Sequence, residues 1–370
     1  MKVCLFGRAS SPFVIRWAEF LSGQGHEVHV ISFADASIPG ATVHYIKPLP
    51  FLGKLNYFLK IPKIRGLVRR IAPDVINAHY ISSYGYIAAK MGFRPVVQSV
   101  WGSDVFVTPH QLGALRRIVQ YTLDTADVIT SECPTTSEYL ERTFSIPPSK
   151  IETFAWGIQT NLFLQDHTGA AARLRRELDI PESAPVVMSV RSTAAIYGTL
   201  EMVEAMPAVL KRHPNAHLLL FSGNVEPDYR DRLLKKAEEL GVKHRVRYVD
   251  RHLSHLEMAV FMKASDIQLS IPSSDSASTA LLEGMLCGLV SVVSDIPTNR
   301  EVVRNGENGF VIPYENSQAL GEVLIKILDD LPGWKSKFVQ KNKEFVLAHH
   351  DWNKLAPLMP QVYQKAIRGL

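Results

Sequence analysis

A serine-rich segment, residues 272–288, carries residue types that could hold a phosphate beside a sugar. The apolar runs around it predict a strand, a loop and then a helix that begins near Ser278. A helix N-terminus offers unpaired N–H groups and partial positive charge, which favour a phosphate. Glu283, inside this helix, could accept hydrogen bonds from neutral hydroxyls such as those of a ribose, and Asp275 precedes the helix. Further donors come from three hydroxyls: Ser276, Ser278 and Thr279. This pattern indicates a nucleotide-sugar site, although Ser and Asp before a helix are also ordinary N-caps.

The residues after this helix extend the pattern. Gly288 ends the predicted helix, residues 291–295 read as a strand, and an Asn-Gly turn follows at 305–306. The whole run resembles the C-terminal signature of the family-4 retaining glycosyltransferases, which have the GT-B fold. In that family two glutamates flank seven residues, and here Asp275 stands where the first is expected. The resemblance implies that Asp275 orients the transferred sugar and that Glu283 holds the ribose.

Composition indicates a globular protein with room for two domains. The chain has 370 residues, 46% of them hydrophobic, and no apolar stretch as long as a membrane span. Its first residues run directly into a strand and are too short for a secretory apolar region. Three cysteines stand singly, without metal or disulfide spacing, which points to a reducing cytosol. We therefore expect a cytoplasmic location.

The net charge of +5 resides entirely in residues 1–165, where residues 47–70 are strongly basic. The cations of this stretch alternate with aromatic and aliphatic residues, and no acidic residue intervenes before Asp74: Lys47, Lys54, Lys60, Lys63, Arg65, Arg69 and Arg70. Such a stretch can lie on an anionic membrane, at the inner face, or hold an acidic acceptor. A solvated helix edge has the same pattern. No nucleic-acid-binding motif accompanies the charge, so nucleic acid is not an expected partner.

Strands alternate with amphipathic helices along both halves of the chain, which predicts parallel sheets covered on both faces. The first series of predicted strands is Val3–Phe6, Glu27–Phe33, Thr42–Ile46, Val75–Ala78, Pro95–Val100 and Val128–Ser131. The second series is Val186–Val190, His217–Phe221, Arg245–Val249, Ile267–Ile271, Ser291–Ser294 and Phe310–Ile312. Predicted helices between them include 82–91, 112–125, 136–143, 199–212, 228–240, 256–263 and 317–328.

The fold expected is therefore α/β, with two doubly wound Rossmann-like domains. We expect an N-terminal acceptor domain of residues 1–165 and a C-terminal donor domain of residues 166–350. The resemblance implies that the two face a cleft and that the C-terminal helix, residues 351–370, crosses back to the first domain. Ligands of open α/β sheets bind beyond the carboxyl ends of the strands, so the functional residues should lie there.

Arg191 directly follows a predicted strand and so emerges at such an end. In the resembled family an arginine here and a lysine six residues later neutralise the donor diphosphate, but this chain has Tyr197 at the lysine position. A tyrosine donates one hydrogen bond and brings no cationic charge. Arg191 would therefore supply most of the positive charge that stabilises the leaving diphosphate, since its planar guanidinium can donate to two phosphate oxygens at once. An arginine paired at a domain surface is the alternative.

Three weaker candidates complete the predicted site. Asp104 follows Trp101, which stands where many relatives carry a histidine; Asp104 could position a sugar hydroxyl or cap a loop. Ser10 lies in the loop after the first strand and could cap the next helix or help hold a phosphate. Asp250 ends a strand where relatives contact the nucleotide base. His79, after another strand, we expect to be structural rather than chemical.

Together these residues imply a retaining transfer of a sugar from a nucleoside-diphosphate donor to an acceptor hydroxyl. UDP is the expected nucleotide from its frequency among relatives, and a saccharide or lipid-linked acceptor in polysaccharide biosynthesis is expected. The sequence has no Asp-x-Asp pair, so no metal and no cofactor are expected. Two alternatives stay open: a nucleotide-sugar-binding protein without turnover, and a nucleotide-sugar epimerase of the same fold.

Overall fold

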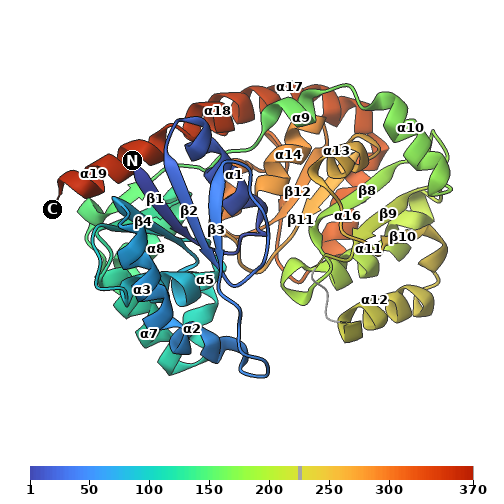
Figure 1. The fold of residues 1–370 in the computed structure, drawn as a ribbon. Helices are drawn as coiled ribbons and strands as arrows, with labels where there is room; N and C mark the ends of the chain where they lie inside the picture. Colours follow the sequence, from blue (N-terminus) through green and yellow to red (C-terminus); the bar gives the residue numbers. More distant parts are fainter. Residues whose placement is uncertain (224–226, 370) are drawn as a thin grey trace. The chain divides into compact units, whose positions relative to one another are not determined.

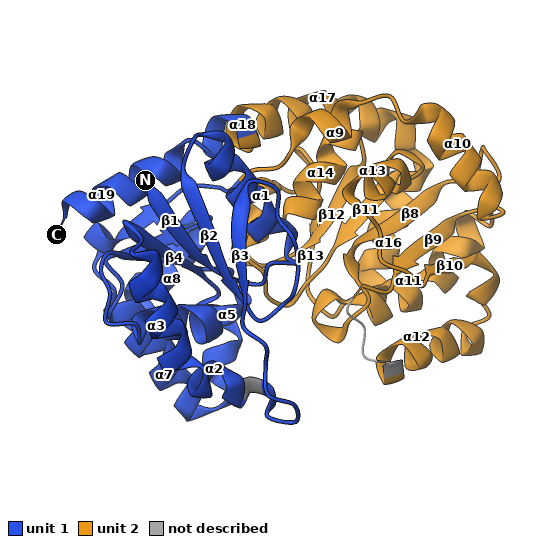
Figure 2. Cartoon of the chain, in the orientation of Figure 1, with its two compact units in different colours: residues 1–156, 353–370 blue, residues 157–352 orange. Residues whose placement is uncertain are grey.

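The computed structural model describes residues 1–223 and 227–369, apart from the side chains of residues 54 and 227. The chain divides into two compact units (Figure 2). Unit 1 comprises residues 1–156 and 353–370, and unit 2 comprises residues 157–352. The sequence placed these boundaries after residue 165 and after residue 350.

Unit 1 is built on a seven-stranded sheet of order β3-β2-β1-β4-β5-β6-β7, in which every neighbouring pair is parallel. Its strands are β1 (Lys2–Phe6), β2 (Glu27–Ser32), β3 (Ala41–Tyr45), β4 (Val75–His79), β5 (Val96–Ser99), β6 (Val128–Ser131) and β7 (Ile151–Thr153). Sequence reasoning missed β7 because it has only three residues, none fully buried, and so shows no apolar run.

The helices of unit 1 cover this sheet (Figure 1). They are α1 (Pro12–Gly23), α2 (Asn56–Leu59), α3 (Ile61–Ile71), α4 (Tyr86–Ala89), α5 (Ser103–Phe106), α6 (Thr108–Gln111), α7 (Gly113–Asp124), α8 (Pro134–Phe144) and α19 (Leu358–Arg368). The helix predicted over 82–91 is wrong in part, because a π-helical turn occupies Ile81–Gly85 and α4 is a single turn. The predicted return of the C-terminal helix is confirmed: the Tyr363 hydroxyl of α19 donates to Asn77 Oδ1 of β4 at 2.9 Å.

Unit 2 holds a six-stranded parallel sheet of order β10-β9-β8-β11-β12-β13. Its strands are β8 (Val186–Ser192), β9 (His217–Phe221), β10 (Val246–Val249), β11 (Ile267–Ser270), β12 (Val290–Ser294) and β13 (Phe310–Ile312). The accompanying helices are α9 (Thr160–Leu164), α10 (Thr168–Glu177), α11 (Thr199–Arg212), α12 (Pro227–Glu239), α13 (His255–Lys263), α14 (Thr279–Cys287), α15 (Pro297–Val302), α16 (Ser317–Asp329) and α17 (Leu331–His349). A short helix, α18 (Trp352–Leu355), leads into unit 1. All six strands predicted for this half are present.

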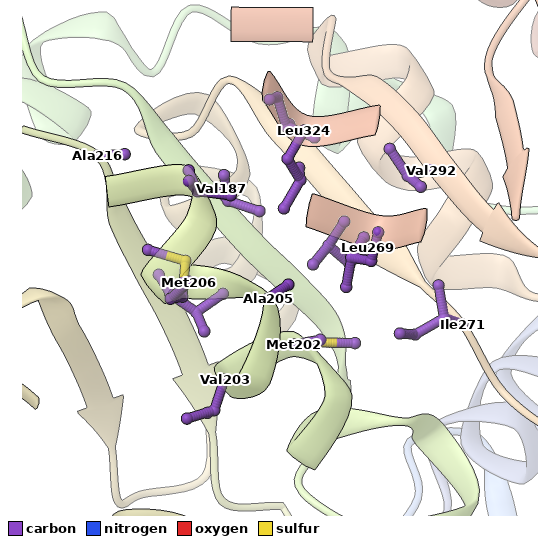
Figure 3. Packing of buried hydrophobic residues seen from close by; sticks show 14 of the residues in the cluster. Val187, Met202, Val203, Ala205, Met206, Ala216, Leu269, Ile271, Val292 and Leu324 are labelled. Carbon is purple, nitrogen blue, oxygen red and sulfur yellow. The ribbon is translucent and has the colours of Figure 1, made fainter. Parts of the chain in front are cut away.

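The core of unit 2 explains why most residues of its strands are apolar. Val187, Leu269 and Val292, from three adjacent strands, pack against Met202 and Met206 of α11 (Figure 3). Strands covered by helices on both faces have no solvent face, so apolar residues follow one another along them. The two doubly wound sheets expected from the sequence are thus confirmed.

Both sheets share one topological feature that positions a site. The chain leaves β8 toward β9 on one side and leaves β11 toward β12 on the other, although β8 and β11 are neighbours. Where the winding direction reverses, the loops after the two strands diverge and open a crevice at their carboxyl ends. In unit 2 these loops begin near Arg191 and Pro272. The same reversal occurs between β1 and β4 in unit 1.

Candidate functional site

Arg191 lies at the carboxyl end of β8, where the pairing with β9 shifts register between Met188 and Ser192. Such a bulge redirects the following side chain. The Ser189 hydroxyl fixes the local backbone, because it accepts from the Arg191 N–H at 3.2 Å and donates to the Arg191 carbonyl at 3.0 Å. The guanidinium is thereby aimed at the segment after β11.

The Arg191 guanidinium meets two groups of that segment. Its Nη1 donates to the Ser278 hydroxyl at 2.9 Å and lies 2.9 Å from Asp275 Oδ2. The side chains of Arg191 and Asp275 are 16% and 15% exposed, so the ion pair is largely withdrawn from water but open on one side. The structure thus brings together three residues that the sequence proposed for one site.

Tyr197 completes the surroundings of the guanidinium. Its ring centroid lies 4.4 Å from Arg191 Cζ, a cation–π distance, so the ring supports the face of the guanidinium plane. Gly198, directly after it, has φ +65°, and a Cβ there would lie 2.8 Å from the Ile271 carbonyl oxygen. Glycine at 198 therefore lets the Tyr197 turn approach the end of β11 closely.

The N-terminus of α14 opens beside Arg191. Ser278 is its N-cap and accepts from the Leu281 N–H at 3.4 Å. A Cβ at Gly284 would fall 1.9 Å from Gln268 Oε1, so this glycine allows α14 to lie against β11. Gly288, at φ +87°, ends the helix in the left-handed conformation. Ser278 and Gly288 thus mark where α14 starts and stops, and Gly284 lets it pack on the sheet.

Burial disfavours both charges of this pair, and each charge stabilises the other. Burial raises the pKa of Asp275 above its usual value, and the nearby Arg191 charge only partly offsets this. Burial alone would lower the pKa of Arg191, but Asp275 and Tyr197 outweigh it and the pKa is raised. The guanidinium therefore stays protonated, and the carboxylate is the more easily neutralised partner.

The other predicted residues of this segment line the start of α14. Ser276 is buried, and its N–H donates to Asp275 Oδ1 at 3.0 Å. Thr279 is the first residue of α14 and is half-buried. Glu283, one turn further, is 9% exposed. Burial first, and the Glu283 charge second, raise the pKa of Cys287 to about 12, so its thiol is not a nucleophile.

Two predicted residues lie elsewhere. Asp250 follows β10, which β9 separates from β8, and it is exposed and paired with Arg230 at 2.8 Å. Ser10 belongs to unit 1, is exposed, and accepts from Arg8 Nε at 3.0 Å. The N-cap position of α1 is Ser11, which makes no side-chain capping bond.

Asp104 in unit 1 has the geometry of a loop anchor. Its side chain is fully buried and accepts from the Ile81 N–H at 2.8 Å and the Trp101 N–H at 3.0 Å. Burial raises the pKa of Asp104 to about 6, although several backbone donors oppose that shift. A carboxylate occupied in this way favours the loop-capping alternative over contact with a sugar hydroxyl.

An aromatic cluster at the carboxyl ends of β4 and β5 was not anticipated as a unit. His79 is 1% exposed, and its ring centroid lies 5.9 Å from that of Trp101 and 5.8 Å from that of Trp156. Phe13 lies 5.2 Å from Trp101. Burial lowers the pKa of His79 to about 3, so the ring is neutral. Trp101 and His79, each directly after a predicted strand, were the sequence signals for this cluster.

Within the described part of the chain, no group of three or more His, Cys, Asp or Glu residues is arranged to hold a metal ion. No helix among the described residues is both long and apolar enough to cross a membrane.

The two parallel sheets have the GT-B fold, and the chain matches two family models of glycosyltransferases. Residues 2–133 match the family described as "Glycosyl transferase 4-like", and residues 171–345 match "Glycosyl transferases group 1". Each match falls within one of the two units. The chain belongs to the family-4 glycosyltransferases, as the resemblance indicated.

Similar proteins agree with this assignment. A D-inositol 3-phosphate glycosyltransferase of Corynebacterium glutamicum is 26% identical over 285 residues, which are 70% of this chain and 65% of that protein. Sucrose-phosphate synthase from Thermosynechococcus elongatus has the same fold, with a TM-score of 0.87, 19% identity and complete coverage of both chains. Anabaena HepE in complex with UDP and glucose has a TM-score of 0.82 and 18% identity, covering 99% of this chain and 100% of that one.

Proposed function

We propose that this protein is a retaining, metal-independent glycosyltransferase that uses a UDP-sugar. The single observation that carries the proposal is the Arg191 guanidinium, 2.9 Å from the Ser278 hydroxyl at the start of α14, at the switch point of the unit 2 sheet. A cation and a helix N-terminus aimed at one place suit a diphosphate. The choice of UDP is supported by the similar fold of Anabaena HepE, described in complex with UDP and with UDP-glucose.

Departure of the diphosphate is the hard step, because negative charge grows on it as the bond to the anomeric carbon breaks. Donors fixed beforehand lower this barrier more than they stabilise the bound substrate. Arg191 and the N–H groups at the start of α14 supply such donors without a metal ion. Asp275 would orient the sugar hydroxyls, and Glu283 would accept from the ribose. The departing phosphate would take the acceptor's proton, so the reaction proceeds on one face and retains configuration.

The acceptor would be a saccharide or lipid-linked saccharide of polysaccharide biosynthesis, bound by unit 1 at the cytoplasmic side of a membrane. The supporting feature is the second switch point, between β1 and β4. Tyr80, directly after β4, holds φ 75° and ψ 96°, an uncommon conformation for a residue with a side chain. Such outliers gather at functional sites. Partly exposed Tyr80 and Trp101 there offer aromatic surface to a sugar ring.

Thermal unfolding with UDP, GDP and ADP tests the donor. A ligand at about 100 times its Kd stabilises by about 2.7 kcal/mol, so UDP should raise the Tm most, and EDTA should leave the shift intact. Arg191→Ala and Glu283→Ala should reduce the shift. If no nucleotide raises the Tm, the proposal fails.

Product analysis then separates the transferase from its alternatives. A transferase releases UDP only as a new glycoside forms, and NMR of that glycoside should show the donor's anomeric configuration. An epimerase would convert the donor sugar without acceptor and without releasing UDP. A binding protein would raise its Tm with the donor and release nothing.

A further inference from the structure

We propose that residues 47–70 of unit 1, here called the basic-apolar segment, form a preformed anchor for an anionic lipid surface. This inference deepens the proposed function by giving the membrane contact a defined structural element. Its test is independent of donor binding.

The apolar part of the segment is concentrated and exposed. Ten large hydrophobic side chains are exposed among the described residues, and five of them lie within the segment: Leu49, Phe51, Leu55, Phe58 and Leu59. Phe51 is the extreme case, at 104% relative exposure. Isolated exposed hydrophobics are ordinary, but such a concentration marks an interaction surface.

The loop that presents these side chains is held in place from within. Asn56 is only 4% exposed and closes the loop with three hydrogen bonds. The Leu49 N–H donates to Asn56 Oδ1 at 2.6 Å, and Asn56 Nδ2 donates to the carbonyls of Leu49 at 3.1 Å and Gly53 at 3.0 Å. The backbone of Phe51 has φ 64°, a conformation that a bulky side chain rarely adopts. The loop therefore exposes Phe51 at a cost in backbone strain. The chain before α2 forms this loop (Figure 1).

The helix that follows adds charge without apolar exposure. In α3, Ile64, Val68 and Ile71 are buried, so this helix packs on unit 1 by one face. Six cations of the segment make no salt bridge among the described side chains: Lys47, Lys60, Lys63, Arg65, Arg69 and Arg70. With no acidic residue between positions 36 and 73, nothing within the segment neutralises them.

Charge and composition favour lipid over a protein partner. All charges of the segment have one sign, since it contains no acidic residue, and this suits a surface of uniform negative charge. An interfacial lipid anchor combines apolar side chains that enter the headgroup region with cations that contact anionic lipids. Each Lys or Arg near such a surface strengthens binding by about 1 kcal/mol, or roughly fivefold. The match in both properties identifies an anionic bilayer as the occupant.

Vesicle co-sedimentation of the full chain tests the proposal, with phosphatidylcholine alone or mixed with phosphatidylglycerol. We expect binding only to the anionic vesicles, and weakening between about 0.1 M and about 1 M salt, as the Debye length falls from about 10 Å to about 3 Å. The triple variant Phe51→Ser, Leu55→Ser, Leu59→Ser and the double variant Lys63→Glu, Arg69→Glu should each reduce binding at least tenfold. Leu112→Ser and Lys211→Glu, exposed elsewhere, are the matched controls and should not change it.

Three results would overturn the proposal: no sedimentation of the unmodified protein with anionic vesicles, equal binding by the segment variants, or a dimer in solution that the triple variant disrupts. For every variant, the Tm without ligand reports folding, and the Tm shift on adding UDP reports donor binding. Vesicle binding without any UDP shift would leave the anchor standing and remove the proposed donor.

Discussion

The substitution Asp275→Asn separates two roles of the Arg191–Asp275 ion pair. In the structure Asp275 Oδ2 lies 2.9 Å from Arg191 Nη1, in a group that a diphosphate would also contact. The carboxylate therefore competes with the phosphate for the guanidinium and repels it. Asparagine has nearly the same shape but no charge. We expect it to strengthen UDP binding while slowing sugar transfer, because a carboxylate no longer orients the sugar hydroxyls.

The size of the effect on UDP affinity follows from Coulomb's law. A phosphate charge bound by Arg191 would lie about 5 Å from the carboxylate, and with an effective dielectric constant of about 20 their repulsion is about 3 kcal/mol. The residual exposure of the Arg191 and Asp275 side chains, 16% and 15%, reduces this value by solvent screening. We therefore expect tighter UDP binding by about tenfold, or about 1.4 kcal/mol.

Calorimetric titration with UDP and a transfer assay with the UDP-sugar measure the two effects on the same preparation. Asp295→Asn is the matched control, since Asp295 also pairs with an arginine, Arg300, but is more exposed at 35%. It should alter neither value. Weaker or unchanged UDP binding by Asp275→Asn would refute the reasoning, as would unimpaired transfer.

Three further predictions concern the elements around the two switch points. Gly284→Ala should destabilise unit 2 by about 1–3 kcal/mol in chemical denaturation, because the new Cβ would collide with a buried side chain of β11. The control is Gly169→Ala, also in a helix, where the new Cβ meets nothing within 4 Å; it should be neutral or stabilising. The pKa of Asp104 is raised from 3.8 to about 6 in the folded state, so the folded protein binds this proton more tightly than the unfolded chain does. The free energy of unfolding should therefore fall as the pH rises from about 4 to about 6. The fall should total about 3 kcal/mol and vanish in Asp104→Asn, as Tm measured against pH would show. Tyr197→Lys should lower the Tm without ligand, by repulsion from Arg191, and enlarge the Tm shift with UDP.

Most of the fold could be predicted because buried parallel strands leave largely apolar runs, as in 186–190 and 217–221. The start of α14 at Ser278 and its end at Gly288 followed from capping rules. Short elements escaped prediction: β7 has three residues, and the π-helical turn after Tyr80 depends on hydrogen bonds that no local pattern records.

The candidate site could be predicted only for residues that lie at or just after the carboxyl end of a strand. Arg191 and Asp275 are 84 positions apart, and only the neighbouring order of β8 and β11 brings them into contact. For Asp104 the prediction from residue type was misleading. Its carboxylate suggested a catalytic role, but its burial and its hydrogen bonds from backbone N–H groups arise only when the loop folds. Asp250 likewise ends a strand, yet pairs on the surface with Arg230.

The most direct test of the central claim is calorimetric titration of UDP, in EDTA, into the unmodified protein and into Arg191→Gln. Two charge-assisted hydrogen bonds to a diphosphate are worth about 3–6 kcal/mol together, so Arg191→Gln should weaken binding by more than about a hundredfold. Arg300→Gln, at an exposed ion pair, serves as the control and should bind like the unmodified protein. Equal UDP affinity in Arg191→Gln, with its Tm retained, would contradict the claim that Arg191 and the start of α14 hold the donor diphosphate.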